Sequence, residues 1–161
     1  MKKILIPCDF SKPFTEAFRF GISFARSIGA SVTVLHVIDL PALADPMLGQ
    51  TFVIDAGIYD SLTRLAQQKF EQLRKKYAPD LPIKFEVKQG PVGMIIEEYS
   101  RQPSLDYIVM GTHGVTGLKE FFVGSNTERV VRFSNVPVFA VRKAKEFSSI
   151  KNNCCSHHYG A

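Results

Sequence analysis

The sequence is poor in cysteine and contains no long apolar run. Only three cysteines occur among 161 residues: Cys8 lies in an apolar stretch, whereas Cys154 and Cys155 are adjacent near the C-terminus. This number and spacing exclude a disulfide framework, and we interpret Cys8 as a buried apolar residue. No segment approaches the roughly 18 consecutive apolar residues that mark a membrane-spanning helix. We therefore expect neither a disulfide scaffold nor a membrane partner.

Signals for export and for nucleic-acid binding are also missing. The start of the chain, Met1–Pro7, is basic, but its apolar run is too short for a signal peptide and no small-residue cleavage site follows it. The protein is therefore expected to be cytoplasmic. The net charge of +5 is spread along the chain, apart from a modest cluster at Arg142–Lys145. Because no basic-aromatic stripe accompanies this charge, we expect no nucleic-acid partner, although the charge suits an anionic ligand.

Signatures of catalysis and of metal binding are scarce. The chain has no Walker-type lysine, no pair of catalytic carboxylates and no cluster of aspartates. His113 lies between two glycines without a nucleophile or carboxylate at a recognisable spacing, and His36 falls within a predicted strand, where a core histidine is expected. The tail Cys154–His158 holds metal-ligating residue types, but adjacent ligands strain tetrahedral geometry. We predict no catalytic and no metal-binding residue.

Short apolar runs rich in isoleucine and valine alternate with helical patterns along the chain. The predicted strands are Lys3–Cys8, Val32–Ile38, Ile83–Val87, Tyr107–Met110 and Pro137–Val141. The predicted helices are Pro13–Ile28, Ile58–Tyr77, Val92–Tyr99 and Ser125–Phe133. Continuous apolar strands are typical of a sheet covered by helices on both faces, and this alternation implies parallel βαβ units. The sequence predicts one α/β domain over residues 1–145, followed by a polar C-terminal tail over residues 146–161.

One segment interrupts this regularity. Asp39–Gly57 is long for a connection between a strand and a helix, and it is strongly apolar. Such a segment is more often a lid, a short extra helix or a contact surface than a free loop.

A glycine motif follows the fourth predicted strand. Gly111 and Gly114 are separated by two residues, and nine further residues lead to Gly124 and Ser125 at the start of a helical stretch. Glycines let a backbone approach phosphate oxygens, while the free N–H groups of a helix start attract anions. Ser125 can cap the helix or contact a phosphate. The alternative is that the glycines only form tight turns. Because ligands of parallel sheets bind at the carboxyl ends of strands, the motif favours a nucleotide site.

These residues together resemble the ATP-binding branch of the universal stress protein family. The resemblance spans Met1 to about Arg142 and rests on five stretches: Lys2–Ser11, Leu35–Asp39, Asp106–Gly114, Gly124–Ser125 and Val136–Val141. The family's ATP signature, G-x2-G-x9-G followed by Ser or Thr, is present without a gap. The resemblance implies a flavodoxin-like, Rossmann-like three-layer sandwich whose five-stranded parallel sheet has the order 3-2-1-4-5.

The resemblance also implies which residues contact ATP, alone or with Mg²⁺. Asp9, with the backbone of Pro7 and Cys8, is expected at the adenine and ribose end, where the Val37 backbone also meets the adenine. Met110 and Gly111 are expected beside the ribose, and Gly114 beside the phosphates. The phosphate tail is expected to be held by Gly124, Ser125, Asn126 and Thr127. Asn126 departs from the small apolar residue that many relatives carry, but it still presents a backbone N–H.

The implied function is that of an ATP-binding stress-response or regulatory protein. It is expected to act as a homodimer through its last strand, since Val136–Val141 would otherwise leave an exposed apolar edge. Two alternatives remain at this point: a slow ATPase or nucleotidyl-handling enzyme of the same superfamily, and a scaffold that keeps the fold without nucleotide. Asp9 could also act only as a helix cap.

Overall fold

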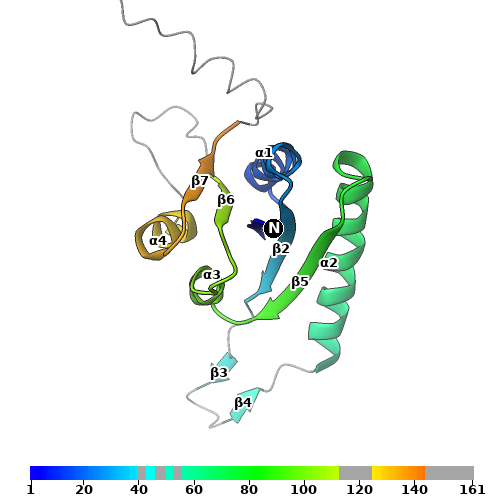
Figure 1. The fold of residues 1–161 in the computed structure, drawn as a ribbon. Helices are drawn as coiled ribbons and strands as arrows, with labels where there is room; N and C mark the ends of the chain where they lie inside the picture. The colour runs from blue at the N-terminus through cyan, green and yellow to red at the C-terminus, as the bar shows by residue number, and fades with distance from the viewer. Residues whose placement is uncertain (40–42, 46–49, 53–55, 113–124, 144–161) are drawn as a thin grey trace, which may run out of the picture.

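Five parallel strands form the central sheet of the protein (Figure 1). The computed structural model describes residues 1–39, 43–45, 50–52, 56–112 and 125–143. The strands of the sheet are β1 (Lys3–Cys8), β2 (Ser31–Ile38), β5 (Ile83–Gln89), β6 (Tyr107–Gly111) and β7 (Val138–Val141). Their order, β5-β2-β1-β6-β7, is the predicted 3-2-1-4-5 when the strands of this sheet are counted along the chain. The flavodoxin-like fold is therefore confirmed.

Helices cover both faces of the sheet, as the continuous apolar strands predicted. The helices are α1 (Lys12–Ile28), α2 (Ala56–Tyr77), α3 (Val92–Ser100) and α4 (Ser125–Phe133). Helices α1 and α2 lie on one face, whereas α3 and α4 lie on the other (Figure 1). Within the described residues, no helix is long and apolar enough to cross a membrane.

Each face of the sheet has its own apolar core. Alternating residues of β1 divide between them: Ile4 and Ile6 pack beneath α1 and α2, while Leu5 packs beneath α3 and α4. The first core is rich in aromatic rings, among them Phe18 and Phe70, whose centroids lie 6.2 Å apart. The two cores cover both faces of β1 at the centre of the sheet. Packing on both faces holds the carboxyl end of β1 in place.

Helix α1 has a well-defined start and end. The Ser11 hydroxyl accepts a hydrogen bond from the Phe14 amide at 3.2 Å, which caps the first turn. The helix ends at Gly29, whose φ of 63° is left-handed. These two caps fix the length of α1 and the position of its first turn, directly after β1.

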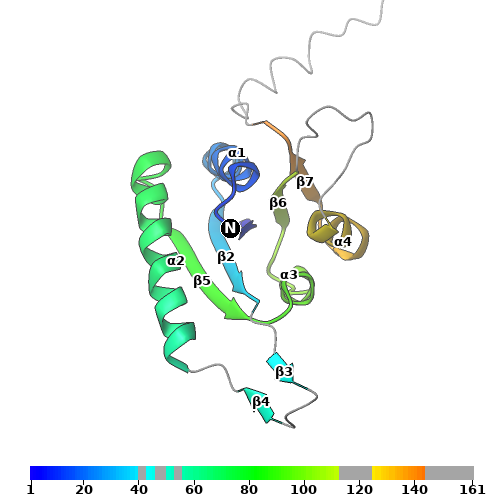
Figure 2. The ribbon, with the colours of Figure 1, turned by 180° about the vertical axis from the view of Figure 1, so that it is seen from behind.

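A small antiparallel hairpin lies outside the main sheet. It comprises β3 (Leu43–Asp45) and β4 (Gln50–Phe52), and it stands apart from the five-stranded sheet in both views (Figures 1 and 2). The hairpin lies within the Asp39–Gly57 segment. A short extra helix, one of the three alternatives for this segment, is not what its described residues form. The lid and contact-surface interpretations stay predictions.

Four strand boundaries differ from the sequence prediction, and two of these differences have a clear physical reason. Strand β5 continues to Gln89 because it pairs with β2 as far as Ile38. Strand β7 begins at Val138 rather than at Pro137. The Pro137 carbonyl still accepts a hydrogen bond from the Ile108 amide at 3.0 Å, but proline has no N–H to donate to a ladder. Pro137 therefore leads into the edge strand without belonging to it.

Candidate functional site

A cavity of about 270 Å³ opens at the carboxyl ends of β1, β2 and β6. The chain leaves β1 toward β2 on one side and returns to β6 on the other, so this is the point where the strand order reverses. Open parallel sheets bind their ligands at such a switch point. The cavity is lined by Pro7, Cys8, Asp9, Ser11, Pro13, Phe14, Leu35, His36, Val37, Val92, Ile96, Met110, Gly111, Asn126 and Thr127.

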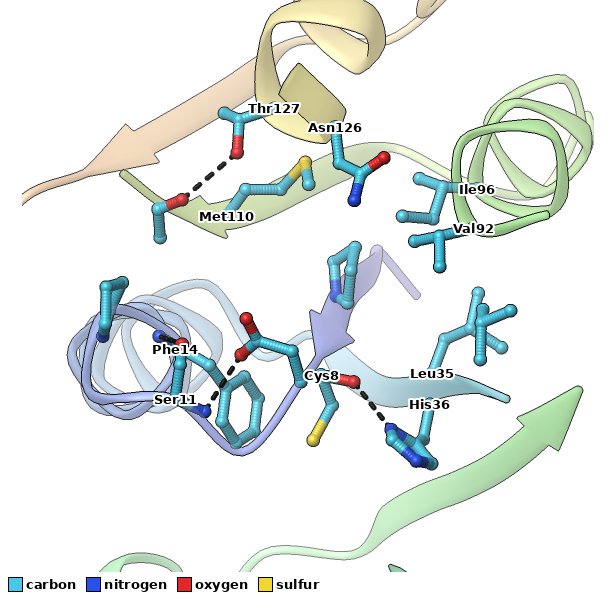
Figure 3. A pocket seen from close by; sticks show the side chains of 15 residues that line it. Cys8, Ser11, Phe14, Leu35, His36, Val92, Ile96, Met110, Asn126 and Thr127 are labelled. Carbon is cyan, nitrogen blue, oxygen red and sulfur yellow. Dashed lines mark hydrogen bonds between the residues drawn. The ribbon is translucent and has the colours of Figure 1, made fainter. Parts of the chain in front are cut away.

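The two sides of the cavity come from different halves of the chain. In Figure 3, Ser11, Phe14 and Cys8 lie on one side, and Met110, Asn126 and Thr127 lie on the other. Much of the wall is apolar and is built by Pro7, Leu35, Val37, Val92, Ile96 and Met110. The polar residues of the wall are Asp9, Ser11, His36, Asn126 and Thr127. A largely apolar wall with a small number of polar groups is typical of small-molecule sites.

The turn between β1 and α1 presents the carboxylate of the site. Asp9 is exposed and lines the cavity, and its Oδ1 accepts a hydrogen bond from the Ser11 amide at 2.9 Å. Phe10, between these two residues, has a φ of +59°. Because a carboxylate can only accept hydrogen bonds, Asp9 is suited to hydroxyl or amine donors of a ligand.

Gly111, at the end of β6, lies unusually close to the first turn of α1. A Cβ at this position would lie 2.4 Å from both the carbonyl carbon and the carbonyl oxygen of Pro13. No other residue type fits there without moving the backbone. Because Gly111 has no side chain, the carboxyl end of β6 can lie against the first turn of α1 at one edge of the cavity.

Thr127 ties the start of α4 to the same strand end. Its side chain is 5% exposed, and its hydroxyl donates to the Gly111 carbonyl at 3.1 Å (Figure 3). The family resemblance implied that Thr127 is one of the phosphate contacts. The structure shows that its hydroxyl hydrogen is already used, so Thr127 can donate to a phosphate only through its backbone.

Cys8 and His36 are the other titratable groups of the described cavity wall. Burial raises the pKa of the Cys8 thiol, so the thiol stays protonated at neutral pH and is a poor nucleophile. The His36 Nδ1 lies 2.8 Å from the Cys8 carbonyl oxygen, which can only accept, so Nδ1 carries a proton. Cys8 is buried, as predicted, whereas His36 is half-buried and lines the cavity instead of lying in the core. Across the described part of the chain, no group of three or more His, Cys, Asp or Glu residues could hold a metal ion.

Most of the described residues that the sequence assigned to the site line one cavity. They are Pro7, Cys8, Asp9, Val37, Met110, Gly111, Asn126 and Thr127. Ser125 is the first residue of α4, so its backbone stands at the helix start where anions are favoured. Gly114, Gly124 and His113 lie outside the described residues. The proposed phosphate contacts at Gly114 and Gly124 therefore stay predictions.

Sequence reasoning missed the part of the wall that comes from α3. Val92 and Ile96 lie one helical turn apart and both line the cavity. Their spacing predicted an apolar helix face, but nothing in the sequence indicated that this face extends beyond the core into a ligand site. Ser11 and Phe14 could have been found, because the first turn of a helix that follows β1 must lie beside Asp9.

Comparison with known proteins gives a consistent match. Residues 1–142 match the universal stress protein family. The universal stress protein MJ0531 of Methanocaldococcus jannaschii is 33% identical over 150 residues, covering 90% of this chain and 84% of that protein. The solved structure of the universal stress protein UspA from Lactobacillus plantarum superposes with a TM-score of 0.72 at 28% identity, covering 88% of this chain and 97% of that one.

Two more distant structures of the same fold contain adenine nucleotides. One is a universal stress protein in complex with cAMP, 17% identical with a TM-score of 0.57. The other is a family member from Arabidopsis thaliana with AMP bound, 15% identical with a TM-score of 0.56. At this level of identity they show a likeness of fold alone.

Proposed function

This chain belongs to the universal stress protein family, and we propose that within it the protein is an ATP-binding regulatory module that acts as a homodimer. The observation that carries the proposal is the cavity at the carboxyl ends of β1, β2 and β6. Its apolar slot, its single carboxylate and its position beside the start of α4 suit the three chemically different parts of a nucleotide.

The adenosine portion occupies the described cavity. The base lies between Pro7 and the apolar residues of α3, where Val92 and Ile96 exclude water. Asp9 accepts a hydrogen bond from a donor of the adenosine. The phosphates extend toward the backbone N–H groups at the start of α4, where the helix dipole favours negative charge. The cAMP and AMP complexes of distant relatives support an adenine nucleotide as the ligand.

A magnesium ion that accompanies ATP would be held mainly by the phosphates and by water. The described cavity wall offers it only one carboxylate, that of Asp9. Magnesium in nucleotide sites is commonly bound through one or two carboxylates together with substrate phosphates. The ion would neutralise phosphate charge.

The homodimer proposal rests on the open side of β7. In the described part of the chain, β7 pairs with β6 and with no further strand, so one of its edges is unpaired. Unpaired strand edges invite a partner, and two copies of one edge can satisfy each other across a twofold axis. The carbonyls of Pro137 and Val141, which are four residues apart, accept hydrogen bonds from the β6 side of the sheet. Alternate residues of a strand direct their backbone groups to the same side. Strand geometry therefore directs the N–H and C=O of Val138 and Ala140 toward the open edge.

Mass spectrometry of the purified, denatured protein tests the nucleotide proposal. We expect an adenine nucleotide to be released, with ATP as the main species. Val92→Trp should abolish this signal because the indole fills the slot. Met94→Trp is the matched control, since Met94 lies on the same helix, is 60% exposed and is not part of the cavity wall. Absence of nucleotide from the unmodified protein, together with no binding of added ATP, would favour the scaffold alternative.

A further inference from the structure

Phe10 has an unusual backbone conformation for a large side chain. Its φ of +59° lies in the left-handed region, and it is the one non-glycine residue with positive φ among those the structure describes. Residues with a Cβ, and bulky ones above all, avoid this region because of steric clashes. Such an outlier persists only when the surrounding contacts determine it, and outliers of this kind cluster at functional sites.

Three side chains hold the Phe10 ring in place. The ring centroid lies 5.0 Å from that of His36 and 6.1 Å from that of Phe14, with an interplanar angle of 75° in the second pair. The Lys69 Nζ lies 5.7 Å from the ring centroid, within the range of a cation–π interaction. These contacts come from β2, α1 and α2, so the ring is anchored by three separate elements.

The residues on both sides of Phe10 are fixed as well. His36 donates from Nδ1 to the Cys8 carbonyl, which immediately precedes Asp9 in the chain. The Ser11 amide donates to Asp9 Oδ1 across the Phe10 turn. No residue that the structure describes donates to the other carboxylate oxygen of Asp9. The turn thus fixes one oxygen, and within the described residues the second one accepts no hydrogen bond at the cavity wall.

We propose that Phe10 is a positioning residue for ligand binding: its left-handed conformation, anchored by His36, Phe14 and Lys69, orients the Asp9 carboxylate toward a hydroxyl or amine donor of the nucleoside. The inference rests on the proposed function for the identity of the ligand. The geometry of the turn can be measured separately from ligand binding. Phe10 itself touches no ligand in this account and acts through Asp9.

The experiment compares two substitutions at Phe10 that both remove the ring. Phe10→Asn keeps a residue type that tolerates positive φ, whereas Phe10→Val introduces a β-branched residue that does not. We expect Phe10→Val to weaken ATP binding in calorimetry by roughly tenfold or more, the loss of one hydrogen bond to a charged group. Phe10→Asn should bind ATP more tightly than Phe10→Val. Equal ATP affinity of Phe10→Val and the unmodified protein would overturn the proposal.

A double-mutant cycle separates positioning from a general structural effect. In an Asp9→Ala background, Phe10→Val should change ATP affinity by less than about twofold, because the group it positions is gone. A full additional loss in that background would assign Phe10 a merely structural role. Phe24→Val is the matched control. Phe24 is buried and, like Phe10, makes several ring contacts, at 5.0 Å with Phe139 and 5.2 Å with Tyr107, but it does not adjoin Asp9 in the chain.

A measurement without nucleotide keeps the positioning claim independent of the proposed function. The Ser11 amide proton, observed by NMR, reports the hydrogen bond to Asp9. The protection of this proton from exchange with solvent should fall in Phe10→Val and stay unchanged in Phe24→Val. Unchanged protection of the Ser11 signal in Phe10→Val would refute the positioning role, whatever the protein binds. If the unmodified protein binds no ATP, the proposed function fails, and the Ser11 signal still decides whether Phe10 sets the turn.

Discussion

At the scale of single residues, the site depends on how closely Gly111 approaches the first turn of α1. An alanine Cβ there would lie 2.4 Å from backbone atoms of Pro13, so one of the two backbones must move. We expect Gly111→Ala to lower the free energy of unfolding by about 1–3 kcal/mol, the usual cost of overpacking, and to weaken ATP binding. Chemical denaturation and calorimetry measure the two effects.

Gly29→Ala provides the comparison for this prediction. A Cβ at Gly29 would meet no atom within 4 Å, so its cost is limited to the left-handed conformation of that residue. Because Gly29 ends α1 far from the cavity wall, this variant should be destabilised yet bind ATP normally. Normal ATP affinity in Gly111→Ala would show that the close contact with Pro13 is not needed for binding.

Single residues also show where sequence reasoning succeeds and where it stops. Asp9 could be placed at the site because it directly follows a buried strand, and position along a strand is readable from the sequence. The role of the Thr127 hydroxyl could not be predicted, since its bond to Gly111 joins residues that are 16 positions apart. The left-handed backbone conformation of Phe10 could not be predicted either, because no glycine or asparagine near it in the sequence suggests such a turn.

At the scale of secondary-structure elements, the edge strand β7 makes the assembly testable. Phe139 packs on Phe20 and Phe24 at centroid distances of 5.8 and 5.0 Å, so a charge at Phe139 would damage the core. Ala140 is exposed, and its N–H faces the open edge. Ala140→Pro removes this donor without removing a bond to β6. We therefore expect this variant to fold and to sediment as a monomer.

The matched control for the edge is Ala140→Thr. Threonine keeps the N–H and suits a strand, so this variant should remain a dimer. Sedimentation of both variants and of the unmodified protein at micromolar concentration gives the answer. A monomer for the unmodified protein would reject the homodimer, and a dimer for Ala140→Pro would place the interface on another surface.

The elements themselves were largely predictable, with one informative exception. Strands and helices of the main fold follow from apolar periodicity, and the parallel order follows from their alternation together with the family resemblance. The β3–β4 hairpin did not follow, because Asp39–Gly57 is apolar without a clear period. Such short strands, which pair only with each other, contain too few residues to show the alternating pattern from which a strand is predicted.

At the scale of the whole molecule, we predict that the described cavity binds its ligand without rapid turnover. Its titratable groups are Asp9, Cys8 and His36. Burial keeps the pKa of Cys8 raised, and the His36 Nδ1–H is engaged by the Cys8 carbonyl. We expect ATP hydrolysis well below the roughly 10 s⁻¹ that is typical of enzymes. Phosphate release at or above that rate, abolished by Asp9→Ala or by His113→Ala, would favour the ATPase alternative.

The central claim is that an adenine nucleotide occupies the cavity at the carboxyl ends of β1, β2 and β6. Titration of the isotopically labelled protein with ATP, followed through backbone amide signals, tests it most directly. We expect saturable shifts that are largest at Asp9, Val37 and Gly111, and negligible shifts along the outer side of α2. An absence of saturable shifts at millimolar ATP, or shifts that gather away from the cavity, would show that the nucleotide does not bind there.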